Sequence, residues 1–177
     1  MPRPDFTEYG TYFQRYIDYT PGDDARQVLE NSVAPLEQFL STIPEEKLHY
    51  AYNTGKWTVA QLLQHVIDTE RVFAYRAMCI SRGEEQGLPG FDENLYAENA
   101  TASNRTLDDL IEELLLVRKT TLILFRHISD NQLLRQGIAS NNPVMPNAIA
   151  FIIVGHVMHH QKILTDRYLS AIASALH

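Results

Sequence analysis

Three of the seven histidines lie close together, at His156, His159 and His160, inside a long apolar segment that spans 148–169. An α-helix completes a turn in about 3.6 residues, so His156 and His160 project from the same face. Two imidazole rings at this spacing can bind one cation, and neutral imidazole is a ligand for zinc, nickel, copper and iron. Isoleucines share that face, so the two rings point toward a core where each needs a polar partner. The spacing alone leaves open whether that partner is a metal ion or a hydrogen-bonding group.

His65 supplies a third candidate ligand from a different predicted helix, which spans about 58–82. Thr58 and Gln61 fit a capping box that starts this helix, and His65 falls on its largely apolar face. In helical bundles, side chains from separate helices converge in the core, and metal sites are commonly built in this way. Three histidine nitrogens with a fourth position left for water form a catalytic arrangement for zinc. A metal at these three histidines would lower the pKa of a bound water or thiol, or act as a Lewis acid.

Three further residues lie near this candidate site. Asp68 follows His65 by three residues and could orient it or bind water in the site, although ordinary solvation on the helix face fits equally well. His159 lies about 100° around the helix from His160, which favours a surface or interface role over one beside the metal. Arg76 shares the face of His65 and could bind an anionic group of a substrate, but pairing with a carboxylate of the bundle is the simpler interpretation.

The sequence lacks the motifs of several other enzyme classes. Val157 stands where the glutamate of a His-Glu-x-x-His metalloprotease would lie, although the histidine spacing is similar. There is no Gly-x-Ser-x-Gly nucleophile motif and no glycine-rich phosphate-binding loop. Glu-x-x-His does not occur twice, as a di-iron carboxylate bundle would require. These absences disfavour a protease, a serine hydrolase, a nucleotide-binding protein and a di-iron protein.

Four segments with apolar residues at helical spacing predict an all-α protein, a four-helix bundle formed by one domain over 1–177. Pro35 should kink the first helix. Aromatic residues near the N-terminus predict a short helical segment before it, which packs onto the main body or places a tyrosine in a pocket. The long connection between the second and third helices is typical of a functional lid or of a crossing between the ends of a bundle. The four predicted helices span about 24–42, 58–82, 106–129 and 147–175.

Composition narrows the possible functions. The formal net charge is −7 and no basic run occurs, which argues against nucleic-acid binding, because phosphate contacts need clustered lysine and arginine. Cys79 is the single cysteine, so no internal disulfide can form. The N-terminus lacks the apolar core of a signal peptide, and the longest apolar run, 148–154, is far too short to span a bilayer. We therefore expect a cytoplasmic protein that is not attached to a membrane.

Four motifs in order resemble the DinB-like superfamily, which includes the YfiT-like proteins described as metal-dependent hydrolases. The motifs are GKWTVAQ at 55–61, HVIDTERVFAYR at 65–76, LPGFD at 88–92 and GHVMHH at 155–160. The resemblance implies a four-helix bundle with up-down-down-up connections, a zinc or nickel ion bound by His65, His156 and His160, and assembly as a homodimer. Relatives include thiol-dependent S-transferases and a thiol-dependent maleylpyruvate isomerase.

Two functions are consistent with these features. In the first, the protein is an enzyme whose metal activates water or a low-molecular-weight thiol for attack on a small electrophilic substrate. Asp68 would then tune or orient the site, and the loop around Gly90 would shape its entrance. In the second, the ion only joins two helices, and a dimeric bundle acts as a stress-response or interaction module. An open cavity beside the histidines would favour the enzyme, whereas a fourth protein ligand would favour the structural role.

Overall fold

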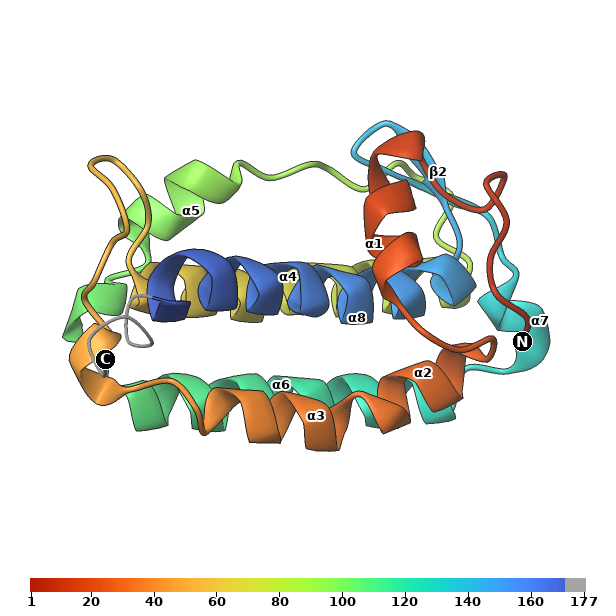
Figure 1. Cartoon of the computed structure of the whole chain (residues 1–177). Helices are drawn as coiled ribbons and strands as arrows, with labels where there is room; N and C mark the ends of the chain where they lie inside the picture. Colours follow the sequence, from red (N-terminus) through yellow and green to blue (C-terminus); the bar gives the residue numbers. More distant parts are fainter. Residues whose placement is uncertain (171–177) are drawn as a thin grey trace.

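The computed structural model describes residues 1–170, and most of these lie in helices that form a bundle (Figure 1). The predicted four-helix bundle is confirmed, with its first helix divided into α2 and α3. The main helices are α2 Ala25–Asn31, α3 Val33–Leu40, α4 Val59–Ser81, α6 Leu107–Arg126 and α8 Pro146–Ile163. The shorter elements are η1 Thr11–Phe13, α1 Gln14–Tyr19, η2 Glu45–Lys47, α5 Glu93–Asn99, η3 Ala102–Asn104, α7 Asp130–Leu133, β1 Gly137–Ala139, β2 Asn142–Val144 and η4 Leu164–Leu169.

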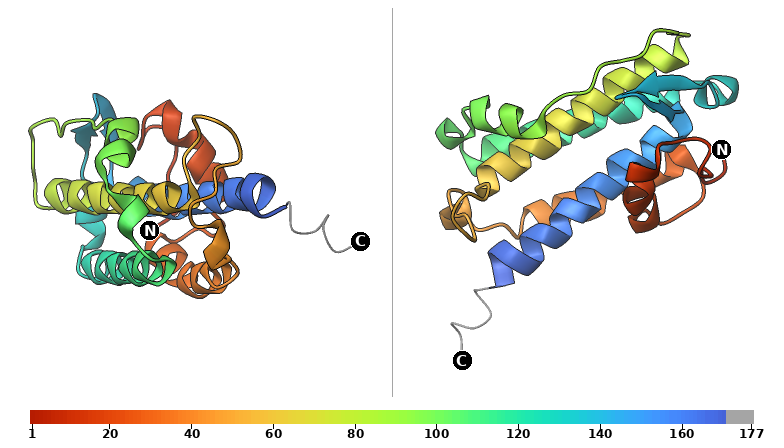
Figure 2. Two further views of the ribbon diagram at one scale, coloured as in Figure 1. Left: turned by 90° about the vertical axis from the view of Figure 1, so that its left-hand side faces the viewer. Right: turned by 90° about the horizontal axis from the view of Figure 1, so that it is seen from above.

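The helices of the bundle follow the up-down-down-up order that the resemblance implies. In Figures 1 and 2, α4 and α6 run in the same direction, whereas α2, α3 and α8 run in the opposite direction. The segment 82–106 makes this possible, because it returns along the bundle from the end of α4 to the start of α6. α4 packs against both α6 and α8. The long connection therefore crosses between the two ends of the bundle, as its length predicts.

The starts of α4 and α6 follow from local sequence. The Thr58 hydroxyl accepts a hydrogen bond from the Gln61 backbone N–H at 3.2 Å, and the Gln61 side chain accepts one from the Thr58 N–H at 2.9 Å. Thr106 and Asp109 form the same reciprocal pair at the start of α6. Each box pairs two backbone donors that a helix start leaves free. These two starts are confirmed, while α6 ends three residues before the predicted boundary, where His127 leaves the helical conformation.

The first predicted helix, 24–42, divides into α2 and α3 at Ser32 rather than bending at Pro35. Pro35 is the third residue of α3, a position where the backbone N–H has no partner within the helix and where proline is tolerated. The Ser32 hydroxyl donates to the Leu29 carbonyl at 2.7 Å and accepts from Arg118 of α6. The expectation of a single kinked helix is thus corrected to two short helices joined by one serine.

Both long connections contain elements that apolar periodicity did not predict. Asp92 caps α5 by accepting hydrogen bonds from two backbone N–H groups of its first turn. The second connection forms a hairpin in which β1 pairs antiparallel with β2, with Ile138 opposite Pro143. Its turn residues, Ser140 and Asn141, have φ angles of +51° and +61°, the conformation that a two-residue hairpin turn requires. Strands of three residues are too short to show an alternating pattern.

The last predicted helix, 147–175, begins at Pro146, where proline is well suited to a first helical turn. α8 continues to Ile163 and passes into the π-helical segment η4, which ends at Leu169. The predicted end at residue 175 lies outside the described residues. Among the helices of the described part of the chain, none combines the length and apolar character needed to cross a bilayer.

Gly155 allows α1 to cross directly over α8. A Cβ atom at this position would lie 1.8 Å from the Tyr16 carbonyl oxygen and 2.7 Å from the Thr20 hydroxyl. The Thr20 hydroxyl in turn lies 2.9 Å from the carbonyl oxygen of Phe151 in α8. The contact is therefore between backbones, and it brings the ring of Tyr16 against His156, with 5.3 Å between ring centroids. The aromatic N-terminal segment both packs onto the body and reaches the histidines.

Replacing Gly155 with alanine is expected to lower the free energy of unfolding by about 2 kcal/mol. Overpacking a buried site typically costs about 1–3 kcal/mol, and here the clashing atoms belong to a backbone that cannot rotate away. The gain of up to about 1 kcal/mol in helix propensity offsets part of this cost. Urea denaturation followed by circular dichroism measures the net change in the free energy of unfolding. Gly87→Ala serves as control, because its nearest neighbour would lie 3.7 Å away; equal stability of the two variants would contradict the backbone contact.

Candidate metal centre

Histidines from α4 and α8 meet at one point in the bundle. The Nε2 atom of His156 lies 3.1 Å from Nε2 of His65 and 3.1 Å from Nε2 of His160. Ligand atoms of all three rings lie within 4.8 Å of one another. The helical spacing of four residues brings His156 and His160 together, and the packing of α4 on α8 adds His65 across 91 positions of sequence. The structure thus places together the three residues that the sequence analysis selected.

Burial keeps these rings neutral. Loss of solvent lowers the pKa of His65 to about 4 and that of His160 to about 2. Burial, followed by the neighbouring His160 and His65, lowers the pKa of His156 well below its ordinary value. A neutral imidazole has one nitrogen with a free lone pair, the form that binds a metal. All three rings can therefore act as ligands at neutral pH.

Hydrogen bonds among the three rings do not account for the cluster. The Nε2 atom of a neutral imidazole is either one donor or one acceptor, yet His156 Nε2 faces two other Nε2 atoms. In addition, the buried Nδ1 atom of His160 has no hydrogen-bond partner among the described residues. Two nitrogens bound to one tetrahedral zinc, each about 2.0–2.1 Å from the ion, lie about 3.3 Å apart. The observed 3.1 Å separations are close to that value, so the donor set fits a divalent ion.

Aromatic rings and a cavity surround the cluster. The indole of Trp57 lies against His65, with 4.8 Å between centroids, and the ring of Tyr16 lies against His156. A cavity of about 370 Å³ reaches His156 and continues along α4 to Arg76. The lining residues come from η1, α1, α4, α5, α8, the hairpin and the loop before α5: Tyr12, Phe13, Tyr16, Thr69, Phe73, Arg76, Phe91, Glu93, Ser140, Asn142 and His156. A small molecule in this cavity would lie beside the histidines.

Asp68 and His159 lie outside the cluster. The Asp68 carboxylate accepts a hydrogen bond from Gln64 at 3.0 Å and lies 3.8 Å from Arg71, and burial raises its pKa. The ring of His159 packs edge-on against Tyr16, 5.6 Å away between centroids. His159 therefore supports the aromatic wall rather than adding a fourth nitrogen. The role predicted for Asp68 stays a prediction, and any influence on the histidines must be indirect.

Arg76 has contacts that differ from the simpler sequence interpretation. Its side chain is 3% exposed, and Nη2 donates to the Pro89 carbonyl at 2.9 Å and to the Ser140 hydroxyl at 2.8 Å. Among the described residues no carboxylate pairs with it. The connections before α5 and between the strands were the least predictable parts of the chain, which is why these partners were not expected.

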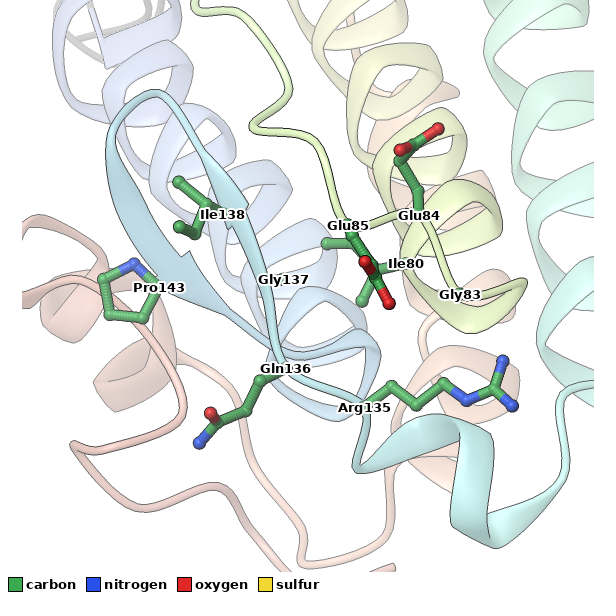
Figure 3. A pocket seen from close by; sticks show the side chains of 9 residues that line it. All are labelled: Ile80, Gly83, Glu84, Glu85, Arg135, Gln136, Gly137, Ile138 and Pro143. Atoms are coloured by element: carbon green, nitrogen blue, oxygen red, sulfur yellow. The ribbon is translucent and has the colours of Figure 1, made fainter.

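A larger hollow of about 700 Å³ lies at the C-terminal end of α4, between Gly83 and the hairpin (Figure 3). Figure 3 shows Ile80 and Ile138 beside it, with Glu84, Glu85 and Arg135 around them. Arg135 donates to the Ser81 carbonyl at 2.6 Å and so supports the end of the helix. None of the clustered histidines reaches this hollow. Its lining offers charged groups, and the one histidine cluster found within residues 1–170 lies elsewhere.

A family model of the DinB superfamily matches residues 28–164, which is more than half of the chain. The chain therefore belongs to the DinB superfamily, as its motifs indicated. No curated protein shows a significant match to the sequence.

Two solved structures show the same fold. One is YfiT from Bacillus subtilis, described as a probable metal-dependent hydrolase with an unusual four-helix bundle topology. It has a TM-score of 0.70 and 22% identity, over 80% of this chain and 82% of that one. The other is a mycothiol-dependent maleylpyruvate isomerase, with a TM-score of 0.65 and 15% identity over 77% of this chain. The chain spans 57% of the isomerase's length, so the similarity concerns only part of that protein.

Proposed function

We propose that this protein is a metal-dependent enzyme in which His65, His156 and His160 bind one divalent ion, zinc or nickel. When bound, the ion would supply Lewis-acid chemistry and lower the pKa of a bound water or low-molecular-weight thiol. The reaction class is hydrolysis or thiol S-transfer on a small electrophilic substrate. The two proteins of similar structure, one described as a probable metal-dependent hydrolase and one as a mycothiol-dependent isomerase, are consistent with these two reaction types.

One observation carries this proposal: three neutral histidines converge at one point, and one of them, His156, lines a cavity large enough for a small molecule. The cluster contains three ligands among residues 1–170, which leaves a position for water or a thiol. The cavity of about 370 Å³ opens on His156. A purely structural ion is usually enclosed by four protein ligands, so this arrangement favours the enzyme over an ion that only joins two helices.

The residues around the histidines have separable tasks. Trp57 and Tyr16 pack against the rings of His65 and His156, fix their orientation and exclude water from them. Thr69 Oγ1 lies 3.5 Å from Nδ1 of His65 and supports the orientation that directs Nε2 toward the other rings. Asp68 would act only through neighbouring groups. We further propose that the protein is cytoplasmic and that it assembles as a homodimer. Light scattering of the purified protein would check the dimer through its molar mass.

The proposal is tested by loading the purified protein with zinc or nickel and measuring metal content and turnover. We expect one ion per chain and activity with either an activated ester or a pair formed by a small thiol and an electrophilic acceptor. Substitution of cobalt adds a spectroscopic measurement, because a thiol that binds the ion changes its visible absorption. Stoichiometric metal without turnover and without any thiol effect would favour the metal-joined, non-catalytic bundle instead. Absence of stoichiometric metal would refute both functions.

A further inference from the structure

Arg76 is a buried cation without a buried anion. Its side chain is 3% exposed, and burying a charge costs several kcal/mol unless a partner compensates for it. Arg118 shows the usual solution, since it is equally buried and forms a two-pronged ion pair with Glu70. Among the described residues, the partners of Arg76 are a carbonyl, a hydroxyl and the ring of Phe73, whose centroid lies 5.5 Å from the guanidinium carbon, and none of them is an anion. Its charge is therefore incompletely balanced by the protein.

The free donors of Arg76 belong to the wall of the cavity. Both of its hydrogen bonds, to Pro89 and Ser140, start from Nη2. Nε and Nη1 carry three further hydrogens, for which residues 1–170 supply no acceptor. Both nitrogens keep some accessible surface, because neither is among the fully buried side-chain atoms that lack a hydrogen-bond partner. Arg76 and His156 line the same cavity. The unused donors thus remain accessible to a molecule that enters it.

We propose that Arg76 forms a carboxylate-binding subsite at the opposite end of this cavity from the histidines. The ligand would be an elongated molecule whose carboxylate pairs with Arg76 while its other end lies beside His156. This inference rests on the proposed function for the part that concerns the histidine end. It identifies the class of substrate or thiol cosubstrate that the centre accepts, namely one that carries a carboxylate remote from its reacting group.

The shape and chemistry of the cavity favour this ligand. A guanidinium presents its donors as a planar fork that matches the two oxygens of a carboxylate. Arg76 is the one lysine or arginine among the described lining residues, and Glu93, the one carboxylate among them, is exposed, so the buried charge of the lining is a single positive one. Thr69 and Arg76 both line the cavity and lie seven residues apart on α4, about 10 Å along its axis. Aromatic side chains, including Phe13 and Phe73, line the space and suit an apolar middle portion.

Calorimetric titration of the zinc-loaded protein with octanoate and octanamide tests the proposal. The two probes have the same length, and only octanoate carries a charge. We expect the wild-type protein to bind octanoate about tenfold more tightly or better, as a charge-assisted pair predicts. Arg76→Gln should remove this preference. Arg82→Gln is the matched control, because Arg82 is an exposed arginine at the end of the same helix and does not line the cavity; it should keep the preference.

Several outcomes would overturn the proposal. Equal binding of the two probes by the wild-type protein would do so without any variant, even if Arg76→Gln fails to fold. A preference that persists in folded Arg76→Gln would place the carboxylate elsewhere. A preference that disappears when zinc is removed would place it on the metal. If the protein binds no zinc, the proposed function fails, but the same titration of the metal-free protein still decides whether Arg76 binds a carboxylate.

Discussion

Replacing His160 with alanine is expected to lower zinc affinity by at least about 100-fold. His160 contributes one of the three nitrogens that cluster in the described part of the chain, and losing a single group that merely supports a ligand already costs about 10–100-fold. The affinity is measured by competition with a chromogenic chelator, and metal content is measured after dialysis. Circular dichroism confirms that the variant is folded. Zinc affinity unchanged from that of the wild-type protein would show that the three histidines do not form the metal site.

His159→Ala is the matched control for this measurement. His159 is adjacent in sequence and carries the same ring, but its ring packs against Tyr16 and Tyr19 and is not part of the cluster. We expect it to bind zinc nearly as tightly as the wild-type protein. A similar loss in both variants would indicate a general disturbance of α8 rather than loss of a ligand. The pair of variants therefore separates the two effects within one helical turn.

The parts of the fold that local sequence encodes could be predicted. Thr58 and Thr106 with their partners three residues later mark helix starts, because the caps need no tertiary contact. The spacing of His156 and His160 likewise follows from one helix. Their meeting with His65 depends on how α4 packs on α8, which spacing within a helix cannot determine. The resemblance to the family supplied that step, and the structure places the three rings together.

The parts that escaped prediction depend on contacts between distant segments. Gly155 looks unfavourable within a helix, and its purpose appears only where the backbone of Tyr16 crosses it. Arg76 donates hydrogen bonds to Pro89 and Ser140, which lie in two irregular connections without apolar periodicity. Asp92, which caps α5, is a local signal that could have revealed this helix. The general framework was thus predictable, as was the alternative that an N-terminal tyrosine reaches a pocket, whereas the contacts that hold Arg76 in the cavity wall were not.

Replacing Glu70 with alanine is expected to lower the free energy of unfolding by about 3–5 kcal/mol. Both oxygens of Glu70 accept hydrogen bonds from Arg118 at 2.8 Å, and the two side chains are only 2% and 1% exposed. Without Glu70, the buried charge of Arg118 retains, among residues 1–170, only the neutral hydroxyl of Ser32 as a hydrogen-bond partner. This loss is large, because the free energy of unfolding of a native protein is only about 5–15 kcal/mol. Urea denaturation at neutral pH measures it.

Two controls make the interpretation specific. Glu113→Ala removes two partly exposed ion pairs, one with Arg71 of α4 and one with Arg105, whose side chains are 49% and 25% exposed; together they should cost about 2 kcal/mol or less. Replacing Glu70 and Arg118 together with methionine removes both buried charges and should recover most of the stability. A loss below 1 kcal/mol in Glu70→Ala, about the value for an exposed pair, would contradict the burial of this pair.

The Glu70–Arg118 pair also bears on the histidine centre, because Glu70 lies on the same helix as His65 and one and a half turns away. Arg118 joins that helix to α6 and, through Ser32, to the junction of α2 and α3. The pair therefore adds to the helix packing that directs His65 of α4 toward α8. We expect the double methionine variant to retain zinc, because helix packing rather than the charges positions His65. Loss of zinc from a stable double variant would instead show that the ion pair itself sets the register of α4.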